Sequence, residues 1–503
     1  MLTGLILTDT RALAAIMNEP QERVCVIINR YIARCAPYIN WYLVDISDAI
    51  YAGLDTRDWH VCASIINDFY CGLGLESVNC PLFILGGDDV IPMPGIENPI
   101  TGVGNRYLHA DFLYCFEEQD AVHLDYLFMQ TPRFAVGRLP LPLKQHKDNL
   151  GQQDLVTYLD ACADLVPSAI SVDKVMMTTA ESFYGASVEM MKDLQAVDET
   201  VFVSPSLDLE NPEMRKSYLE ALRRHDFVIF DLHGSDRQSF PYFVGENKSR
   251  TMYPIALMPS LISYGSPHIF NTIACFGARF VGYDIDLSML RSALAGGTML
   301  YCGSCDTAIG GVDKMLVSTT MMSFYNIYLS QGFPAGMALS KAKQDYFISC
   351  AVRDGFSYAM YTIMEFNLFG CPILSMCPRI SMDYHPAAYN RQLRGKDIMT
   401  YHPEKAQVLY KATSFNEDVR DLVRKSKDIK LEAICTIAEN AIYQYLNYGS
   451  AVLQQVIQVS QDSTNGYRFI FTLSSQKGDD SFEISYIVSV DSNGSVLSVV
   501  CTN

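Results

Sequence analysis

Short apolar runs alternate along this chain with stretches in which apolar residues recur at helical spacing. Strands that alternate with helices are typical of βαβ units and a parallel sheet. In the first part of the chain, the predicted strands lie at 4–8, 42–46 and 81–85, and the predicted helices at 22–34 and 59–71. The pattern therefore predicts an N-terminal α/β subdomain over residues 1–150.

The same alternation starts again after residue 150. The apolar runs here are short and have no alternating polar face, which is typical of strands that helices cover on both sides. They lie at 174–179, 201–203, 227–232, 268–274 and 298–302, with helical patterns at 188–197, 212–224, 287–295 and 315–329. We expect a second parallel-rich sheet, in a subdomain over residues 151–378.

Beyond residue 378 the composition changes. Residues 379–430 carry eleven Lys or Arg against seven Asp or Glu, and we interpret them as a basic connector. A helical pattern at 431–448 is followed by alternating patterns at 452–459, 467–473, 482–490 and 496–501. The predicted fold class is α/β, with two parallel-rich sheets covered by helices. A small α+β domain over residues 431–503 would follow, with one helix on an antiparallel meander.

Composition and charge narrow the classes of function. Of the 503 residues, 49% are apolar and 19% charged, a balance typical of globular proteins. The net charge is −18, which repels phosphate backbones and attracts cationic substrates or partners. We therefore expect no nucleic-acid partner.

Three features of the sequence bear on the cellular compartment of the protein. No run approaches the ~18 consecutive apolar residues of a membrane helix, and the first residues lack the charged and apolar regions of a secretory signal. The fifteen cysteines are odd in number and scattered, which is typical of a reducing compartment rather than of a disulfide framework. We expect a cytoplasmic protein without a membrane span. The sequence makes no prediction of the oligomeric state.

Candidate chemistry lies at the ends of two predicted strands. The run FVIFDLHGS places His233 and Gly234 directly after one strand, and HIFNTIACFG places Cys275 after the next. The carboxyl ends of neighbouring parallel strands meet at one crevice, where a thiol and an imidazole can act as nucleophile and base. The amides of Gly234 and Cys275 could then hold an oxyanion. The alternative is a small core cysteine and an ordinary His-Gly loop.

These two blocks resemble the His-Gly and Cys blocks of caspase-like cysteine peptidases, and of the gingipain family in particular. Further blocks resemble that family in the same order: PLFILGGDDVIP, LHADFLY with Asp111, FAVGRLPLP, AGGTMLYCGSCDTA and FNLFGCPIL. The resemblance covers roughly residues 1–378. The last block reads Gly370-Cys371-Pro372, where the family has Gly-Asp-Pro.

The resemblance implies a caspase-like catalytic subdomain over residues 151–378 and a cysteine endopeptidase activity on protein or peptide substrates. It makes Cys275 the nucleophile and His233 the general acid and base, and it assigns the carboxylate that orients the histidine to Glu181. It also implies a preference for Arg or Lys before the scissile bond. Asp306 and Glu189 are the candidate acids for that pocket.

The resemblance implies no catalytic cofactor, although gingipain-like enzymes hold structural calcium, for which no ligands can be assigned in this chain. It also includes secreted proteins. The run Arg424-Lys425-Ser426-Lys427 offers such an enzyme sites for cutting its own connector.

Two other classes of function compete with the peptidase. The first is an inactive caspase-like scaffold that binds a protein partner through its acidic surface. The second is an α/β nucleotide-binding or transferase protein, against which the absence of a GxGxxG or GxxxxGK[ST] motif counts.

Overall fold

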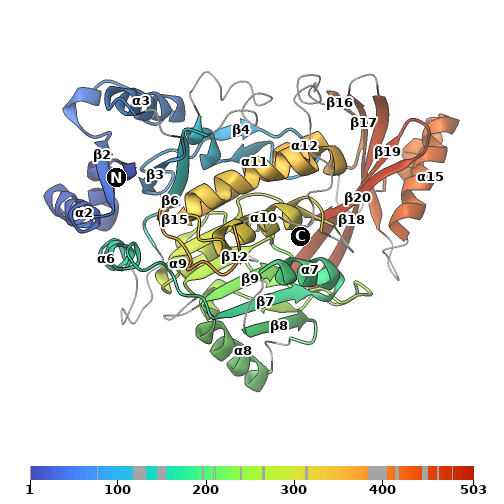
Figure 1. Cartoon of the computed structure of the whole chain (residues 1–503). Helices are drawn as coiled ribbons and strands as arrows, with labels where there is room; N and C mark the ends of the chain where they lie inside the picture. Colours follow the sequence, from blue (N-terminus) through green and yellow to red (C-terminus); the bar gives the residue numbers. More distant parts are fainter. Residues whose placement is uncertain are drawn as a thin grey trace.

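A ten-stranded sheet forms the centre of the molecule (Figure 1). The computed structural model describes residues 2–75, 78–116, 132–143, 154–194, 198–207, 209, 211–237, 241–262, 267–311, 315–382, 405–413, 418–443, 451–461, 464–477 and 480–502. In spatial order the strands are β2 (Ile39–Asp45), β1 (Leu2–Thr8), β3 (Cys80–Leu85), β6 (Phe134–Leu139), β15 (Phe366–Gly370), β13 (Leu300–Ser304), β12 (Ile269–Thr272), β9 (Phe227–Asp231), β7 (Lys174–Ala180) and β8 (Asp198–Ser204).

The sheet consists of two parallel halves joined at one antiparallel pair. Strands β2, β1, β3, β6 and β15 run one way, and β13, β12, β9, β7 and β8 run the other, because β13 pairs with β15 antiparallel. The structure thus corrects the expectation of two separate sheets. The joint is β15. Of the strands in this sheet it comes last in the chain, and it lies between β6 of the N-terminal half and β13 of the other half.

Helices cover the sheet, and further short elements connect them. The helices are α1 (Thr10–Met17), α2 (Gln21–Cys35), α3 (Trp59–Gly72), α6 (Leu155–Leu165), α7 (Tyr184–Leu194), α8 (Pro212–Arg224), α9 (Met289–Ala295), α10 (Ser318–Ser330), α11 (Ala335–Asp354) and α12 (Phe356–Glu365). The short strands are β4 (Gly95–Glu97), β5 (Tyr107–His109), β10 (Phe243–Val244) and β11 (Ile255–Leu257). Helices α10, α11 and α12 pack on one another, and α11 also contacts β6 and β15 (Figure 1).

The central strands are buried along their whole length. Every residue of β3, β6, β9, β12 and β13 is buried, as expected for a sheet covered on both faces. This confirms the prediction of a largely parallel sheet flanked by helices, with an antiparallel sheet beside it.

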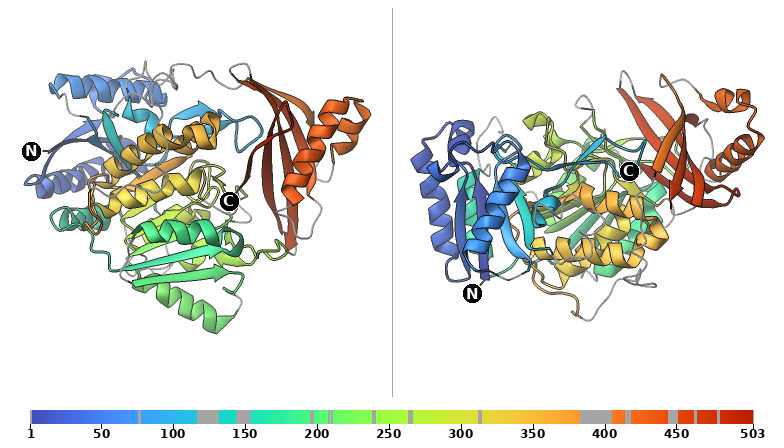
Figure 2. Two further views of the ribbon diagram at one scale, coloured as in Figure 1. Left: turned by 45° about the vertical axis from the view of Figure 1, so that its right-hand side comes forward. Right: turned by 90° about the horizontal axis from the view of Figure 1, so that it is seen from above.

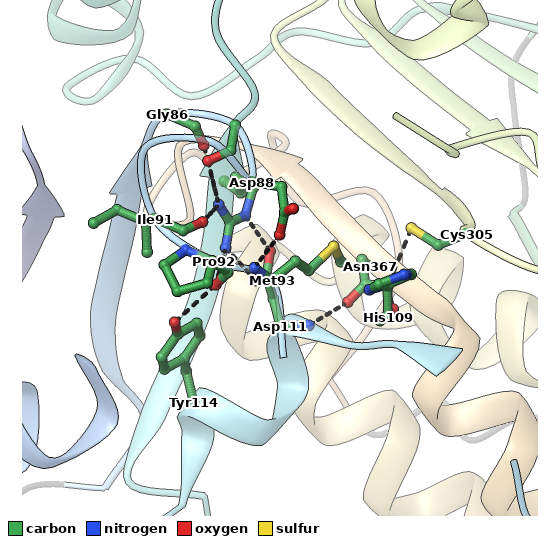
Figure 3. Close-up of polar contacts among 12 residues, drawn as sticks. Gly86, Asp88, Ile91, Pro92, Met93, His109, Asp111, Tyr114, Cys305 and Asn367 are labelled. Carbon is green, nitrogen blue, oxygen red and sulfur yellow. Dashed lines mark hydrogen bonds and ion pairs between the residues drawn. The ribbon is translucent and has the colours of Figure 1, made fainter. Parts of the chain in front are cut away.

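A buried ion pair lies in the N-terminal half of the central sheet. It joins residues from two of the sequence blocks described above, LHADFLY and FAVGRLPLP. Arg138 on β6 is fully buried and donates to both carboxylate oxygens of Asp111 at 2.7 Å. Its remaining donors reach backbone carbonyls, including those of Gly86 at 3.1 Å and Ile91 at 2.7 Å. The Asp111 amide donates to the side chain of Asn367 on β15 (Figure 3). The motif residues Asp111 and Arg138 therefore hold strand ends together.

Five strands of the C-terminal part and the short strand β14, from earlier in the chain, form a six-stranded antiparallel sheet. In spatial order its strands are β14 (Ile309–Gly310), β20 (Val496–Thr502), β19 (Asp480–Asp491), β18 (Thr464–Lys477), β17 (Val452–Gln461) and β16 (Lys405–Lys411). Helix α15 (Ile429–Tyr443) packs on β19 and β20, on the side away from the central sheet (Figure 2). This confirms an antiparallel meander with one helix.

Part of the predicted connector belongs to this second sheet. β16 pairs with β17, and helix α14 (Arg420–Lys425) contacts α15. The sequence run proposed for self-cleavage begins within α14, and residues 383–404 and 414–417 of the connector lie outside the described residues.

Candidate active site

Three neighbouring strands end at one cleft. β9, β12 and β13 are adjacent and parallel, so the residues that follow them meet at the same edge of the sheet. The cleft has a volume of about 210 Å³. Its lining residues are Gly102, Val103, Gly104, Asn105, Gly234, Ser235, Asp236, Arg237, Cys275, Phe276, Thr307, Ile470, Ser485, Ile487 and Thr502.

Gly234 and Cys275 lie directly against each other in this cleft. A Cβ atom added at Gly234 would overlap the carbonyl oxygen of Cys275, so only glycine fits there. Among the described residues, neither the Gly234 amide nor the Cys275 amide donates a hydrogen bond. The structure therefore brings together the two residues predicted to hold an oxyanion.

His233 is buried beside the cleft. Its backbone forms an antiparallel bridge to Val244, with both hydrogen bonds at 2.9 Å, and its ring lies 4.9 Å from that of Phe183, centre to centre. The side chain is only 1% exposed. Its Nδ1 lies 3.1 Å from the carbonyl oxygen of Thr502, at the end of the C-terminal sheet.

The other ring nitrogen of His233 faces the buried carboxylate of Glu246. Nε2 lies 3.5 Å from Oε2 of Glu246, which also lies 3.9 Å from Nε of Arg250. Burial by itself would raise the pKa of Glu246, but the interactions with His233 and Arg250 outweigh burial and lower it. Glu246 is therefore ionised at neutral pH and can stabilise a protonated imidazole.

Glu181, the predicted orienting carboxylate, has a different place. Its side chain is exposed at the end of β7, and its Oε2 accepts a hydrogen bond from the Lys248 amide at 2.8 Å. Its own amide donates to the carbonyl of Glu246 at 2.8 Å. The carboxylate that faces His233 is thus Glu246, and Glu181 holds the loop on which Glu246 lies.

Cys275 follows β12 and is almost completely covered. It is 4% exposed, and its thiol points to the carbonyl oxygen of Ala308, at 3.4 Å. Burial raises the pKa of the Cys275 thiol, and the carboxyl groups of Glu365 and Asp306 act in the same direction. In this arrangement the sulfur is protonated, which is the less reactive form.

The two acids predicted for substrate specificity are not in the cleft. Asp306 is buried, and its carboxylate accepts hydrogen bonds from both nitrogens of Asn105, from the Thr307 amide and from the Tyr361 hydroxyl. It therefore fixes the loop around Asn105, which lines the cleft. Glu189 is exposed on α7 and is not among the lining residues.

Neither a metal centre nor a membrane helix is found in the described part of the chain. No group of three His, Cys, Asp or Glu side chains there could hold a metal ion. No helix there is long and apolar enough to cross a membrane. All fifteen cysteines are free thiols.

Comparisons with known proteins give little to add to this geometry. No protein-family model matches the chain, and no curated protein matches it. A solved structure described as "Structure of Protease" is similar at a TM-score of 0.48 and 11% identity, over 100% of this chain and 97% of that one. A likeness at that level indicates neither a family nor a function for this chain.

Proposed function

We propose that the protein is a cysteine endopeptidase with Cys275 as nucleophile and His233 as general acid and base. One observation carries the proposal. An imidazole backed by an ionised, buried carboxylate lies just beyond β9, next to the cleft that Gly234 and Cys275 line, and among the described residues neither of these two amides donates a hydrogen bond. Activated nucleophile, base, orienting group and oxyanion donors are what acyl transfer requires.

Each group has one task in the proposed reaction. As the Cys275 sulfur attacks the carbonyl carbon of the scissile peptide bond, the thiol proton passes to His233, and the amides of Gly234 and Cys275 hold the oxyanion. His233 gives a proton to the leaving amine as the C–N bond breaks, which leaves a thioester on Cys275. Water then attacks the thioester, and the acid product and the thiol are released. Glu246 acts on His233 as a positioning residue.

The proposed substrates are proteins or peptides with Arg or Lys before the scissile bond. The resemblance to the gingipain family and the net charge of −18 support this preference. The acid that lines the cleft is Asp236, whose side chain is exposed. Asp306 acts in this proposal by holding the cleft wall.

The inactive scaffold is the second candidate, because Cys275 is covered and its pKa is raised. The two candidates differ in what the thiol does. A scaffold binds its partner equally well with alanine at position 275, whereas a peptidase loses turnover.

The test is hydrolysis of fluorogenic peptides that place Arg, Lys, Asp or Leu before the scissile bond. We expect cleavage after Arg and Lys, and a loss of kcat/KM of about 10³-fold or more in Cys275→Ala and in His233→Ala. Cys302→Ala, which removes a buried thiol within the neighbouring strand β13, is the matched control and should keep its activity. Equal turnover in Cys275→Ala would contradict the assignment, and cleavage mainly after Asp or Leu would contradict the preference.

A further inference from the structure

The two-residue strand β14 is completed by the end of the chain's own C-terminal domain. Ile309 pairs with Thr502 and Gly310 with Cys501, in antiparallel register. β14 comes directly after the loop at 305–308, which lies against Cys275 through the carbonyl of Ala308. The edge of β14 thus accepts an extended chain next to the proposed nucleophile, in the manner of β-strand addition.

The end of β20 also contacts the imidazole of His233. The carbonyl oxygen of Thr502 lies 3.1 Å from Nδ1 of His233, and Thr502 lines the same cleft as Cys275. Nε2 faces Glu246, so Nδ1 is the nitrogen left for proton exchange with a substrate. In this structure that nitrogen faces a backbone carbonyl from β20.

We propose that the edge of β14 and the adjoining cleft form the binding site for an extended polypeptide strand, and that β20 occupies this site in cis and keeps the enzyme latent. The inference rests on the proposed function. It adds how substrate binds, as a strand antiparallel to β14, and what must leave first.

The rest of the C-terminal sheet is fastened to the cleft wall. A Cβ atom added at Gly102 would lie 2.8 Å from the end of the Ile470 side chain, and Ile470 and Ile487 are both buried there. The guanidinium of Arg250 lies 4.6 Å from the ring centre of Tyr486. Release of β20 therefore requires separation of a packed interface, which a binding partner or a cut in the connector could bring about.

The state of the thiol agrees with a closed site. Cys275 is 4% exposed, and Thr502, Ile470 and Ile487 from the C-terminal sheet line the same cleft. Removal of these residues would return water to the cleft and lower the cost of forming a thiolate.

Two variants release β20 by different routes. A chain without residues 502 and 503 loses the carbonyl at His233 and the partner of Ile309, but keeps most of the pairing of β20 with β19. Ile470→Asp leaves β20 intact and places a charge in the interface with Gly102. The matched control is Leu497→Asp, also on β20, at a side chain that is 66% exposed.

The first readout is alkylation by iodoacetamide, mapped by mass spectrometry. We expect Cys275 to react at least tenfold faster in both release variants than in the full chain and in Leu497→Asp. Cys302, which is fully buried on β13, reports on the integrity of the fold and should not change. The peptide Ser-Val-Leu-Ser-Val-Val-Ser-Thr, which is residues 495–502 with serine at 501, should slow the reaction again when added in trans.

The second readout is peptide hydrolysis, which should rise in the same two variants by a similar factor. An alkylation rate of Cys275 that stays within twofold of the full chain in both folded variants overturns the inference. Faster alkylation without any hydrolysis keeps β20 as the cover and contradicts the proposed peptidase instead. The two failures are therefore distinguishable.

Discussion

His233 is held between an ionised carboxylate and a backbone carbonyl. Glu246, from the segment that follows β10, faces Nε2, and Thr502, from the C-terminal sheet, faces Nδ1. An ionised acid in a buried site favours the protonated imidazole by direct charge interaction, with little screening by water. Glu246 is therefore placed to hold the ring of His233 in one orientation.

We expect Glu246→Gln to lower kcat more than it raises KM, by about 10- to 100-fold, because the change leaves the cleft wall intact. Glu189→Gln is the control, since Glu189 is an exposed acid on α7 that does not line the cleft. An unchanged kcat in Glu246→Gln would show that the acid does not position His233.

The buried carboxyl group of Asp231, at the end of β9, makes the stability of the fold depend on pH. Burial raises the pKa of Asp231 from its ordinary 3.8 to about 7, against a hydrogen bond from Ser187. Between these values the folded protein holds a proton that the unfolded chain has released. Asp231 therefore contributes a fall in the free energy of unfolding as pH rises from about 4 to 7.

Asp231→Asn should remove this slope, which amounts to a total on the order of 4 kcal/mol at about 1.4 kcal/mol for each pKa unit. Urea unfolding at a series of pH values measures it. Glu199→Gln, at an exposed acid on β8, should leave the slope as it is in the native chain. Identical slopes in the native chain and Asp231→Asn would contradict the assignment.

Sequence reasoning found the residues that directly follow apolar runs and missed those placed by pairing. His233 and Cys275 each directly follow a predicted strand and lie two and three residues beyond the ends of β9 and β12, so the placement of both at one edge of the sheet could be predicted. Glu246 is placed by the bridge between His233 and Val244, because side chains two residues apart on a strand share a face. That bridge involves a two-residue strand, which leaves no periodic pattern in the sequence.

At the level of elements, the antiparallel joint and the buried ion pair decide how the two halves of the sheet meet. β15 lies between β6 and β13, and Asn367 on β15 accepts a hydrogen bond from the amide of Asp111. Asp111 in turn receives two hydrogen bonds from Arg138. These contacts therefore fasten β15, the strand at the joint, to the N-terminal half of the sheet.

Arg138→Met should destabilise the fold by roughly 3–5 kcal/mol, because it leaves the Asp111 carboxylate buried without its partner. Arg106→Met is the matched control. Arg106 pairs with Glu97 at 3.8 Å through side chains that are 76% and 73% exposed, and its loss should cost less than about 1 kcal/mol. Equal midpoints of urea unfolding in the two variants would contradict a stabilising role for the buried pair.

The elements that the sequence did not predict have a common physical reason. The 20-residue helix α11 packs against α10, α12, β6 and β15, so its apolar residues do not gather on one stripe. The joint at β15 depends on pairing between distant segments, which apolar periodicity does not report. By contrast, the buried strands of both halves are short apolar runs, and the alternation in the C-terminal strands matches a sheet that carries α15 on one face.

At the scale of the whole molecule, an antiparallel sheet lies beside a helix-covered, largely parallel sheet (Figures 1 and 2). Residues from both parts line the cleft. In the proposed function, one of the fifteen free thiols, that of Cys275, is the nucleophile that attacks peptide bonds. The geometry of His233, Glu246 and Gly234 singles it out from the other fourteen.

The most direct measurement uses a weakly electrophilic peptidyl acyloxymethyl ketone with Lys next to the warhead, which alkylates activated thiols. The chain that lacks residues 502 and 503 is incubated with this reagent, and the adduct is mapped by mass spectrometry. We expect one adduct for each chain, on Cys275, and none when the same truncated chain also carries His233→Ala. Labelling on any other cysteine, or no labelling while Cys275 is open to iodoacetamide, would contradict the proposed function.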